Sequence, residues 1–529
     1  MKEIQVLDCT LRDGGYCNQW QFGKKNIQRI ISSLNEANVE IIECGFLTEK
    51  VTYDVEVSKF TTVEELANVI PNDKNGRLYV AMINYGEYNI DRLPENNGNS
   101  VDGFRVAFHK KNYVEAMAMC EKIQQKGYLA FVQPMLSMAY SDEEFLKLIS
   151  IANGFNPYAF YIVDSFGMMK RNDLIRLYYL VEHNLNADTW VGFHSHNNMQ
   201  LAYSNAQSLV DQKSSRKLII DCSIYGMGRG AGNLNTELFV QYLNENYNGK
   251  YNLKSLLSII DQVLNDFYRK NYWGYSLPNY LSAAHNVHPN YASFFADKNT
   301  LTAEAMEELF TMMDDEKKIS YDKKYAEEIY LQYMATGQIQ DEHRDELLAK
   351  VAGKEVLLVA PGRSAVDEKN KISSFVATEN VLVVSVNFDY TGADVDYIFL
   401  SNLRRFRELS ADKRSKCIVT SNIPADSVYL QTRYHDLLMP IESVRDNAGM
   451  MAIKFFTELG AKKIVLAGFD GYTHEAEENY ASKQMVLVTK NAVVDAMNMG
   501  MAHMISIYSK KTDICFLTSS RFERHEEIR

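Results

Sequence analysis

The sequence predicts an α/β chain with an N-terminal (β/α)8 TIM barrel, a helical extension and a C-terminal Rossmann-like α/β domain. Its 529 residues exceed what one hydrophobic core usually spans. Short β-rich runs alternate with longer amphipathic runs in the first 230 residues, and a similar pattern returns after about residue 350. Aromatic-rich helical sequence without strands separates the two regions. We therefore expect domains at residues 1–265, 266–350 and 351–529.

Eight apolar runs are the strand candidates of the barrel. Amphipathic stretches such as 24–38 and 173–184 separate them and carry apolar residues at helical spacing. Eight strands with intervening helices are typical of a closed parallel barrel, and a doubly wound open sheet is the structural alternative. The strand candidates are residues 4–10, 41–46, 77–84, 103–109, 129–135, 159–165, 190–196 and 217–223.

A polar side chain stands at the end of each of these runs. In closed barrels the carboxyl ends of the strands form the active-site face, and surface polarity scattered at random would not collect there. These side chains are Asp8, Glu43, Asn84, His109, Gln133, Asp164, His194 and Asp221.

Composition and charge exclude several classes of protein. Apolar residues make up 46% of the chain and charged residues 23%, which is ordinary for a soluble globular protein. The formal net charge of −12 is spread along the chain and repels phosphate backbones, so we expect no nucleic acid partner. The opening residues do not resemble a signal peptide, and no stretch approaches the ~20 apolar residues of a membrane helix. The seven cysteines form no CxxC pair, which indicates free thiols and a cytoplasmic protein.

Two histidines and an aspartate form a candidate metal site at the predicted barrel mouth. His194 and His196 are two positions apart on a strand, so their side chains point to the same face. Asp13 follows the first strand within residues 10–15, where glycines let the backbone turn tightly. Two imidazoles and one carboxylate leave coordination positions open for a bidentate substrate. In the alternative, each histidine is a hydrogen-bonded structural residue and Arg12 with Asp13 is only a surface ion pair.

Five motifs, in order across the first 240 residues, together resemble a superfamily of metal-dependent lyases. This superfamily contains 4-hydroxy-2-oxovalerate aldolase, hydroxymethylglutaryl-CoA lyase and isopropylmalate synthase, and the motifs match the first of these best. They correspond to its opening strand with an Arg-Asp-Gly turn, its fourth, sixth and seventh strand ends, and its last strand with a glycine-rich loop. The motifs are LDCTLRDGG (7–15), FRVAFH (104–109), YIVDSFG (161–167), GFHSHNNMQLAYSN (192–205) and DCSIYGMGRGAGNLNTE (221–237).

The resemblance implies a divalent metal, Mn²⁺ or Mg²⁺, held by Asp13, His194 and His196. Asn233 in the Gly-Ala-Gly-Asn segment would lie close enough to complete the site. The substrates implied by the resemblance are a 2-keto acid and an aldehyde.

The resemblance also implies roles for side chains around the metal. Arg12 would stabilise the enolate oxygen that develops when the carbon–carbon bond breaks. Ser165 would donate a hydrogen bond to the keto acid. Glu43 and His109 stand at matching strand ends, Glu43 as a catalytic candidate and His109 as a substrate-binding candidate. The alternative for these two is a buried hydrogen-bond network that orients Arg12.

The chain departs from the family at the acid/base residue. Hydroxyoxovalerate aldolases carry a histidine shortly after the Arg-Asp-Gly turn, where this chain has Gly-Tyr-Cys around Tyr16. Ile224 stands near the position of a cysteine in the glycine-rich loop of the lyases. Tyr16, His285 and His288 are candidates for the acid/base group. The choice among them depends first on geometry and then on pKa. A changed base suggests a changed aldehyde or acyl acceptor.

The second α/β region contains two motifs that bear on function. Residues 357–366 place a glycine between a strand and a predicted helix, where backbone N–H groups can hold phosphate. Residues 446–475 resemble the central part of sialyltransferase-like Rossmann domains of glycan assembly, which implies nucleotide or nucleotide-sugar binding. The alternative is a docking or structural domain without an active site. Four side chains at predicted strand ends would face a ligand: Asn387, Asn402, Asn422 and Asp470. The strand candidates are residues 355–361, 381–388, 396–402, 416–422, 463–471 and 504–509.

The leading hypothesis is a bifunctional enzyme. The barrel would make or break a carbon–carbon bond beside a 2-keto acid such as pyruvate, and the second domain would bind a nucleotide-sugar. One alternative is Claisen-type condensation or cleavage of an acyl-CoA, and another is an inactive barrel that scaffolds a glycan-assembly transferase domain. A facial-triad iron oxygenase is a third. Retention of Arg12, Asp13, both histidines and Asn233 argues against the inactive scaffold. The sequence leaves a homo-oligomer open.

Overall fold

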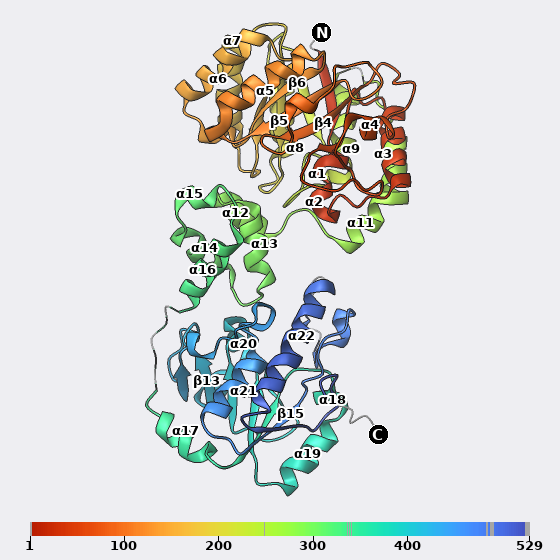
Figure 1. Cartoon of the computed structure of the whole chain (residues 1–529). Helices are drawn as coiled ribbons and strands as arrows, with labels where there is room; N and C mark the ends of the chain where they lie inside the picture. The colour runs from red at the N-terminus through yellow and green to blue at the C-terminus, as the bar shows by residue number, and fades with distance from the viewer. Residues whose placement is uncertain are drawn as a thin grey trace. The chain divides into compact units, whose positions relative to one another are not determined.

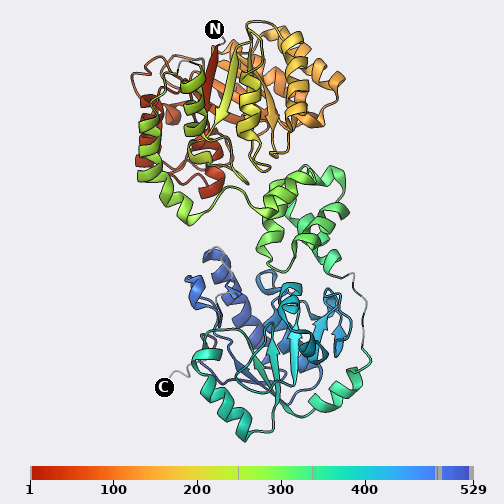
Figure 2. The same ribbon diagram turned by 180° about the vertical axis from the view of Figure 1, so that it is seen from behind.

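A computed structural model of the chain describes residues 3–247, 249–335, 337, 339, 341–482, 485–486 and 491–523 (Figures 1 and 2). The contacts between residues divide the chain into two compact units. The first comprises Met1–Ser293 and Asp315–Tyr321, and the second comprises Phe294–Asp314 and Asp322–Arg529. Within the described ranges, no helix combines the length and the apolar character that crossing a membrane requires.

The first unit is a closed parallel barrel, which confirms the predicted fold. Strand β1 pairs with β9 on one side and with β2 on the other, so the sheet has no free edge between them. A short strand, β3 (Lys59–Phe60), adds to β2 outside the ring. The eight barrel strands are β1 (Ile4–Asp8), β2 (Ile41–Leu47), β4 (Leu78–Asn84), β5 (Gly103–Phe108), β6 (Leu129–Pro134), β7 (Ala159–Asp164), β8 (Trp190–Ser195) and β9 (Leu218–Cys222).

Amphipathic helices surround the strands (Figure 1). In α3, for example, Ile27, Ile30, Ile31 and Leu34 are buried at helical spacing against the sheet. Two short helices, α1 (Thr10–Asp13) and α2 (Gly15–Asn18), follow β1 at the carboxyl end of the barrel. The other helices are α3 (Lys24–Glu36), α4 (Val63–Ala67), α5 (Tyr113–Gln125), α6 (Asp142–Phe155), α7 (Arg171–Asn184), α8 (Ala202–Val210), α9 (Thr236–Asn246), α10 (Leu253–Ile259) and α11 (Asn265–Lys270).

Side chains of alternate strand positions fill the inside of the barrel. Leu7, Val80, Phe131 and Ile219 form one apolar cluster there, and Tyr161 packs with them. The interior is therefore a packed core, and ligands can reach only the two ends of the barrel. Because all eight strands run parallel, their polar last residues share one of these ends.

The helical segment after the barrel contributes to both compact units. In the first unit, the backbone N–H of His288 donates to Lys318 O at 2.8 Å. In the second unit, the Tyr330 hydroxyl donates to Asp446 Oδ2 at 2.7 Å, and Arg445 pairs with Glu327 at 3.0 Å. The helices are α12 (Leu277–Ala284), α13 (Pro289–Asp297), α14 (Ala303–Met312), α15 (Asp315–Lys318), α16 (Lys323–Met334) and α17 (Arg344–Val351).

The second unit is an open, fully parallel sheet in the order β14-β13-β12-β11-β10-β15-β16. The chain builds outward from β10 to β14 and then returns to place β15 beside β10. The order of strands therefore reverses between β10 and β15, where open α/β sheets commonly bind ligands. The strands are β10 (Glu355–Val359), β11 (Leu382–Val386), β12 (Tyr397–Leu400), β13 (Cys417–Thr420), β14 (Leu430–Thr432), β15 (Lys463–Ala467) and β16 (Asp513–Phe516).

Helices cover both faces of this sheet. Ile372 of α19 (Lys369–Thr378) packs with Leu357 and Val465 on one face. Helices α21 (Ala448–Glu458) and α22 (Asn491–Tyr508) lie across the other face (Figure 1). Two short helices, α18 (Ser364–Asp367) and α20 (Leu403–Glu408), follow β10 and β12.

The prediction of a strand at residues 504–509 is wrong. These residues form the end of α22 and the residue after it. The buried side chains Val494, Met501, Met504, Ile505 and Tyr508 follow helical spacing across the whole element. A short apolar run cannot be assigned from its composition alone, and here the longer helical period decides. The neighbouring strand is β16, and the sequence analysis missed it together with the three-residue β14.

Candidate metal centre and active site

The segment after β1 places Arg12 and Asp13 at the carboxyl end of the barrel. Both residues lie in the buried helix α1, directly before two glycines. A Cβ on Gly14 would lie 2.3 Å from Thr10 O, and one on Gly15 would lie 2.0 Å from the ring of Trp20. The φ of Gly14 is −59°, which any residue can adopt. Close approach of neighbouring atoms, rather than the tight turn that we expected, therefore requires glycine here.

The structure brings Asp13, His194 and His196 together. One potential ligand atom from each of the three buried side chains lies within 4.8 Å of the other two. His194 and His196 come from the end of β8 and the residue after it, as the spacing predicted. Asp13 reaches them from α1, on the neighbouring side of the barrel mouth. Two imidazoles and one carboxylate form a set that divalent metals bind.

Asn233 lies against this triad. Its backbone pairs with His196 in an isolated bridge, and its Nδ2 donates to Asp13 Oδ2 at 2.5 Å. Its Oδ1 and the Nδ1 of His196 are buried, and neither has a hydrogen-bond partner among the residues that the structure describes. Buried polar atoms normally have partners, so two orphaned acceptor atoms beside a carboxylate indicate a place for a cation. The four residues fit the divalent metal that the sequence implied.

Asp221 orients His194. The Asp221 carboxylate, at the end of β9, lies 2.9 Å from His194 Nδ1. A carboxylate on Nδ1 favours the proton there and leaves Nε2 free to bind a metal. The pKa of Asp221 is lowered although burial raises it, because Arg105 and His194 stabilise the ionised form.

Arg105 joins the metal triad to the network around Arg12. Its side chain is fully buried, and its guanidinium pairs with Glu43 at 2.8 Å and also with Asp221. Glu43 Oε2 accepts a further hydrogen bond from Arg12 Nε at 2.9 Å. With its amide turned to accept, Gln133 receives two more bonds from Arg105, at 3.0 and 3.2 Å. Glu43 therefore lies in a buried network that orients Arg12.

The formal charges of this network leave room for a cation. Arg12 and Arg105 contribute two positive charges, whereas Asp13, Glu43 and Asp221 contribute three negative charges. One buried negative charge remains in excess, and burying an uncompensated charge is costly. A divalent ion beside Asp13 would turn this excess of one negative charge into an excess of one positive charge.

The protonation states suit metal binding. Burial lowers the pKa of His196 to about 3, although the charge of Asp13 acts against this shift. The pKa of Asp13 lies well below its usual range, because Arg12 and the histidines outweigh the effect of burial. Near neutral pH the site thus presents a neutral imidazole and an ionised carboxylate, which are the forms that ligate metals.

Ser165 and His109 lie at two other strand ends. The buried Ser165 follows β7, and its Oγ accepts a hydrogen bond from the backbone N–H of Leu136 at 2.9 Å. Its hydroxyl proton remains available as a donor. His109 follows β5 and is exposed. Burial of part of its ring, together with nearby positive charge, lowers its pKa. His109 is therefore not a member of the buried network around Glu43. The buried partner of Glu43 is Arg105, which was not predicted although it interrupts an otherwise apolar strand.

Arg229 of the glycine-rich loop is a second residue that the sequence analysis missed. Its guanidinium carbon lies 5.2 Å from the centre of the Tyr16 ring. Its NH1 lies 3.4 Å from His288 Nε2, and its NH2 lies 3.4 Å from Ser165 O. Two of the three acid/base candidates therefore lie beside the same cation. His285 stands at the end of α12, one turn before His288.

Comparisons with known proteins agree with this geometry. Residues 105–263 match the protein family described as HMGL-like. The chain is 29% identical over 249 residues to 4-hydroxy-2-oxovalerate aldolase 2 of Comamonas testosteroni, covering 45% of this chain and 68% of that protein. Over its N-terminal half the chain therefore resembles HMGL-like, metal-dependent carbon–carbon lyases.

Other relatives share the same region of similarity. An oxaloacetate decarboxylase of Mycobacterium tuberculosis is 27% identical over 246 residues, covering 46% of this chain and 70% of that protein. The solved HMG-CoA lyase of Brucella melitensis is 14% identical with a TM-score of 0.40, covering 51% of this chain and 99% of that chain. The HMGL-like match includes Ser165, both histidines and Asn233, whereas Arg12 and Asp13 precede it.

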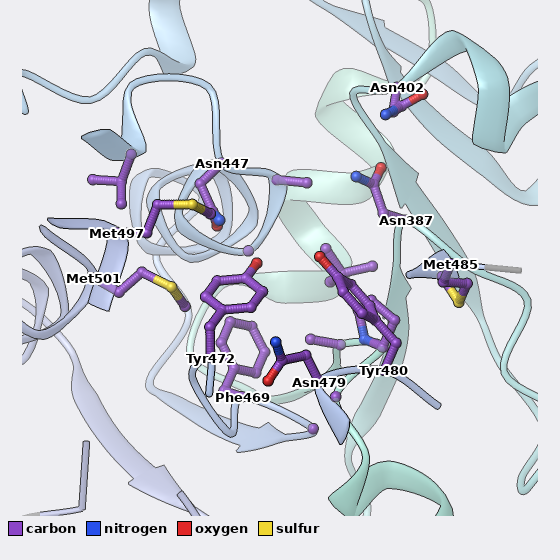
Figure 3. A pocket seen from close by; sticks show the side chains of 18 of the residues that line it. Asn387, Asn402, Asn447, Phe469, Tyr472, Asn479, Tyr480, Met485, Met497 and Met501 are labelled. Atoms are coloured by element: carbon purple, nitrogen blue, oxygen red, sulfur yellow. The ribbon is translucent and has the colours of Figure 1, made fainter. Parts of the chain in front are cut away.

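A separate cavity of about 200 Å³ opens in the second unit (Figure 3). It lies at the carboxyl ends of β10, β11 and β15, where the strand order reverses. Of the strand-end residues predicted to face a ligand, Asn387, Asn402 and Asp470 line it. Asn422 lines a different pocket and donates to Ser401 O at 2.9 Å. Three aromatic rings and three thioethers also line the cavity: Phe469, Tyr472, Tyr480, Met485, Met497 and Met501.

The turn predicted to hold phosphate already has an acceptor. The backbone N–H of Ser364 donates to Asp470 Oδ2 at 2.7 Å, and the Ser364 hydroxyl donates to Oδ1. A carboxylate thus occupies the position at which a phosphate oxygen would bind. Helix α21 also begins on this cavity, and there Asn447 Oδ1 accepts from Met450 N at 3.1 Å.

Proposed function

We propose that the barrel is an aldolase that uses Mn²⁺ or Mg²⁺ to cleave or form a carbon–carbon bond beside a 2-keto acid, through the enolate of pyruvate. The observation that supports this most strongly is the triad of Asp13, His194 and His196 with Arg12 attached to its carboxylate. The names of the relatives agree, since an aldol cleavage and the decarboxylation of oxaloacetate both generate an enolate of pyruvate.

Asp13, His194, His196 and Asn233 would hold the metal. When bound, the ion supplies Lewis-acid polarisation of the keto acid and lowers the cost of negative charge on its oxygen. Asp221 keeps His194 in the tautomer that this requires.

Arg12 is fixed where the enolate oxygen would develop. Its Nε is held by Glu43 at 2.9 Å and its NH1 by Asp13 at 2.6 Å, so the guanidinium cannot turn away from the triad. A cation that is already positioned stabilises developing negative charge without reorganisation during the reaction. Ser165 would donate its hydroxyl proton to the carboxylate of the keto acid.

Tyr16 is the proposed proton-transfer group. Its side chain is 40% exposed at the mouth of the barrel, so a substrate hydroxyl can reach it. His288 is a weaker candidate, because its Nε2 faces a donor on Arg229 and burial lowers its pKa to about 2. In this arrangement His288 would position Arg229, and His109 would contact the outer part of the substrate.

Exchange of the methyl protons of pyruvate in D₂O, followed by NMR, tests this function. The protein loaded with Mg²⁺ should exchange them, and protein treated with a chelator should not. His183→Ala is a matched control, because His183 is two-thirds exposed on α7 and should leave exchange unchanged. Failure of the metal-loaded protein to exchange pyruvate protons would refute the pyruvate enolate assignment.

We also propose that the cavity of the second unit binds a nucleotide or nucleotide-sugar. The supporting observation is its place at the strand-order reversal between β10 and β15. Tyr472 and Tyr480, with ring centroids 6.1 Å apart, offer apolar surfaces for a base or sugar ring (Figure 3). The start of α21 offers backbone N–H groups for a phosphate.

Titration of the full chain with uridine and cytidine diphosphates tests this second proposal. Calorimetry should detect binding that Tyr472→Ala weakens and Tyr275→Ala, an exposed tyrosine of the first unit, does not. Absence of heat with every nucleotide would instead favour a docking or structural domain.

A further inference from the structure

Three arginines lie around the carboxyl end of the barrel, and they differ in their partners. Arg12 and Arg105 are each paired with carboxylates in the buried network. Arg229 has no such pair. Among the described residues no carboxylate lies within ion-pair distance of it, and its buried Nε has no hydrogen-bond partner. A partly buried guanidinium without a directly paired carboxylate can take an anionic group of a ligand as its partner.

The backbone fixes where this guanidinium starts. A Cβ on Gly228 would lie 2.2 Å from Asn233 Nδ2 and 2.8 Å from Asp13 Oδ2, so the loop touches the metal site directly. Gly230 has a φ of +65°, and a Cβ there would lie 2.8 Å from Asn198 Oδ1. Two glycines thus hold the backbone of Arg229 tightly against the site, while its side chain extends into the mouth.

The contacts that hold the side chain of Arg229 are weak. Its two polar contacts among the described residues, to His288 Nε2 and Ser165 O, are 3.4 Å long, which is beyond the usual range of a good hydrogen bond. The Tyr16 ring below it adds a cation–π contact. None of these three partners carries a negative charge at neutral pH. The guanidinium is therefore positioned but not neutralised, as a receptor for an anion is.

We infer that Arg229 recognises a second, distal carboxylate of the keto-acid substrate, so that the barrel acts on dicarboxylates. This inference rests on the proposed function. In that function the metal, Arg12 and Ser165 take the keto-acid end, which leaves Arg229 for a negative group farther along. A guanidinium matches the two oxygens of a carboxylate with parallel hydrogen bonds, which favours a carboxylate over a neutral polar group.

Calorimetric binding of matched keto acids to the Mg²⁺-loaded full chain tests the inference. Each pair differs only in the distal carboxylate: oxaloacetate and 2-oxobutyrate, 2-oxoglutarate and 2-oxopentanoate, 2-oxoadipate and 2-oxohexanoate. For at least one chain length we expect the dicarboxylate to bind about 10-fold or more tightly than its partner, the size typical of a charge-assisted pair. Arg229→Gln should remove this preference and leave the Kd of the monocarboxylate within about twofold.

The other outcomes distinguish failure of this inference from failure of the proposed function. Wild-type protein that shows no preference at any chain length would overturn the inference, as would Arg229→Gln that weakens both members of a pair equally. If no keto acid binds to the metal-loaded wild type, the proposed function fails first. Arg269→Gln is the control for lost charge, since Arg269 is 77% exposed on α11 and should change neither Kd. Arg229→Lys should restore only part of the preference, because lysine lacks the planar fork.

Discussion

Residues of the metal centre are connected by a continuous line of buried ion pairs. The line runs from Arg12 through Glu43, Arg105 and Asp221 to His194. The two arginines and the two carboxylates of this line neutralise one another, so removal of one leaves an uncompensated charge in the buried interior. The geometry of the metal ligands therefore depends on side chains that never touch the metal.

Arg105→Leu tests this dependence. The change leaves Glu43 and Asp221 without their shared partner, and breaking a buried pair in this way costs about 3–5 kcal/mol of unfolding free energy. We also expect Mn²⁺ affinity to fall, because Asp221 can then turn away from His194. Urea unfolding and Mn²⁺ titration measure the two effects. A variant with wild-type values for both would show that the network is dispensable.

Arg12→Lys separates a catalytic role from a structural one. Lysine keeps the charge but loses the planar fork that Glu43 and Asp13 hold. If Arg12 stabilises the enolate, proton exchange on pyruvate should slow by ~10²–10³, the usual effect of removing an oxyanion donor. Pyruvate binding by calorimetry should change far less. Exchange at the wild-type rate, with metal bound, would make Arg12 merely an ion-pair partner.

The metal triad could be anticipated from the sequence, whereas its supporting charges could not. His194 and His196 share a strand face by their spacing alone, and Asp13 stands beside them in a recognisable motif. The roles of Arg105 and Arg229 depend on which strand ends become neighbours when the barrel closes. That information is tertiary, since Arg105 meets an aspartate 116 residues away.

Elements of the barrel follow local sequence more closely than those of the second unit. Each barrel strand is a run of at least five residues, and all eight were predicted. In the second unit β14 has three residues, which is too short to give a periodic signal. The end of α22 resembles a strand when its apolar residues are read in isolation.

The loop after β9 offers a test at the scale of an element. In Gly228→Ala the new methyl group would lie 2.2 Å from Asn233 Nδ2 and 2.8 Å from Asp13 Oδ2. The loop must then move away from the triad, so we expect Mn²⁺ affinity to fall by about tenfold or more. Stability of the apo-protein should fall less, because the barrel core is untouched.

Gly154→Ala is the matched control for this change. Gly154 lies in α6, and a Cβ there would meet nothing within 4 Å. Alanine in a helix should stabilise the protein by roughly 0.5–1 kcal/mol without any effect on metal binding. Equal Mn²⁺ affinities for the two variants would argue against the close contact between the loop and the metal site.

The whole molecule is built from two compact units, and the chain crosses from one to the other more than once. Residues 294–314 and 322–334 belong to the second unit, and residues 315–321 belong to the first. The Thr300 and Tyr330 hydroxyls lie 2.7 Å apart, and Tyr330 also donates to Asp446, so these helices are anchored to the segment before α21. A boundary near residue 350 was the natural expectation, because the new strand pattern begins there.

Three fragments test this organisation. A fragment starting at Phe294 should fold with a higher melting temperature than one starting at Gly353, because only the first retains the contacts of Tyr330 with Asp446 and of Glu327 with Arg445. A fragment ending near Lys350 should keep pyruvate proton exchange. Equal melting temperatures for the two C-terminal fragments would show that the helices of residues 294–334 add nothing to the second unit.

The central claim is the metal centre, and titration with Mn²⁺ followed by electron paramagnetic resonance tests it most directly. Wild-type protein should bind one Mn²⁺ per chain, whereas Asp13→Ala, His194→Ala and His196→Ala should each lose this stoichiometric binding. Their apo-proteins should remain folded, because the packed barrel core supplies most of the stability. Tight binding of one Mn²⁺ by the folded His196→Ala protein would contradict the assignment.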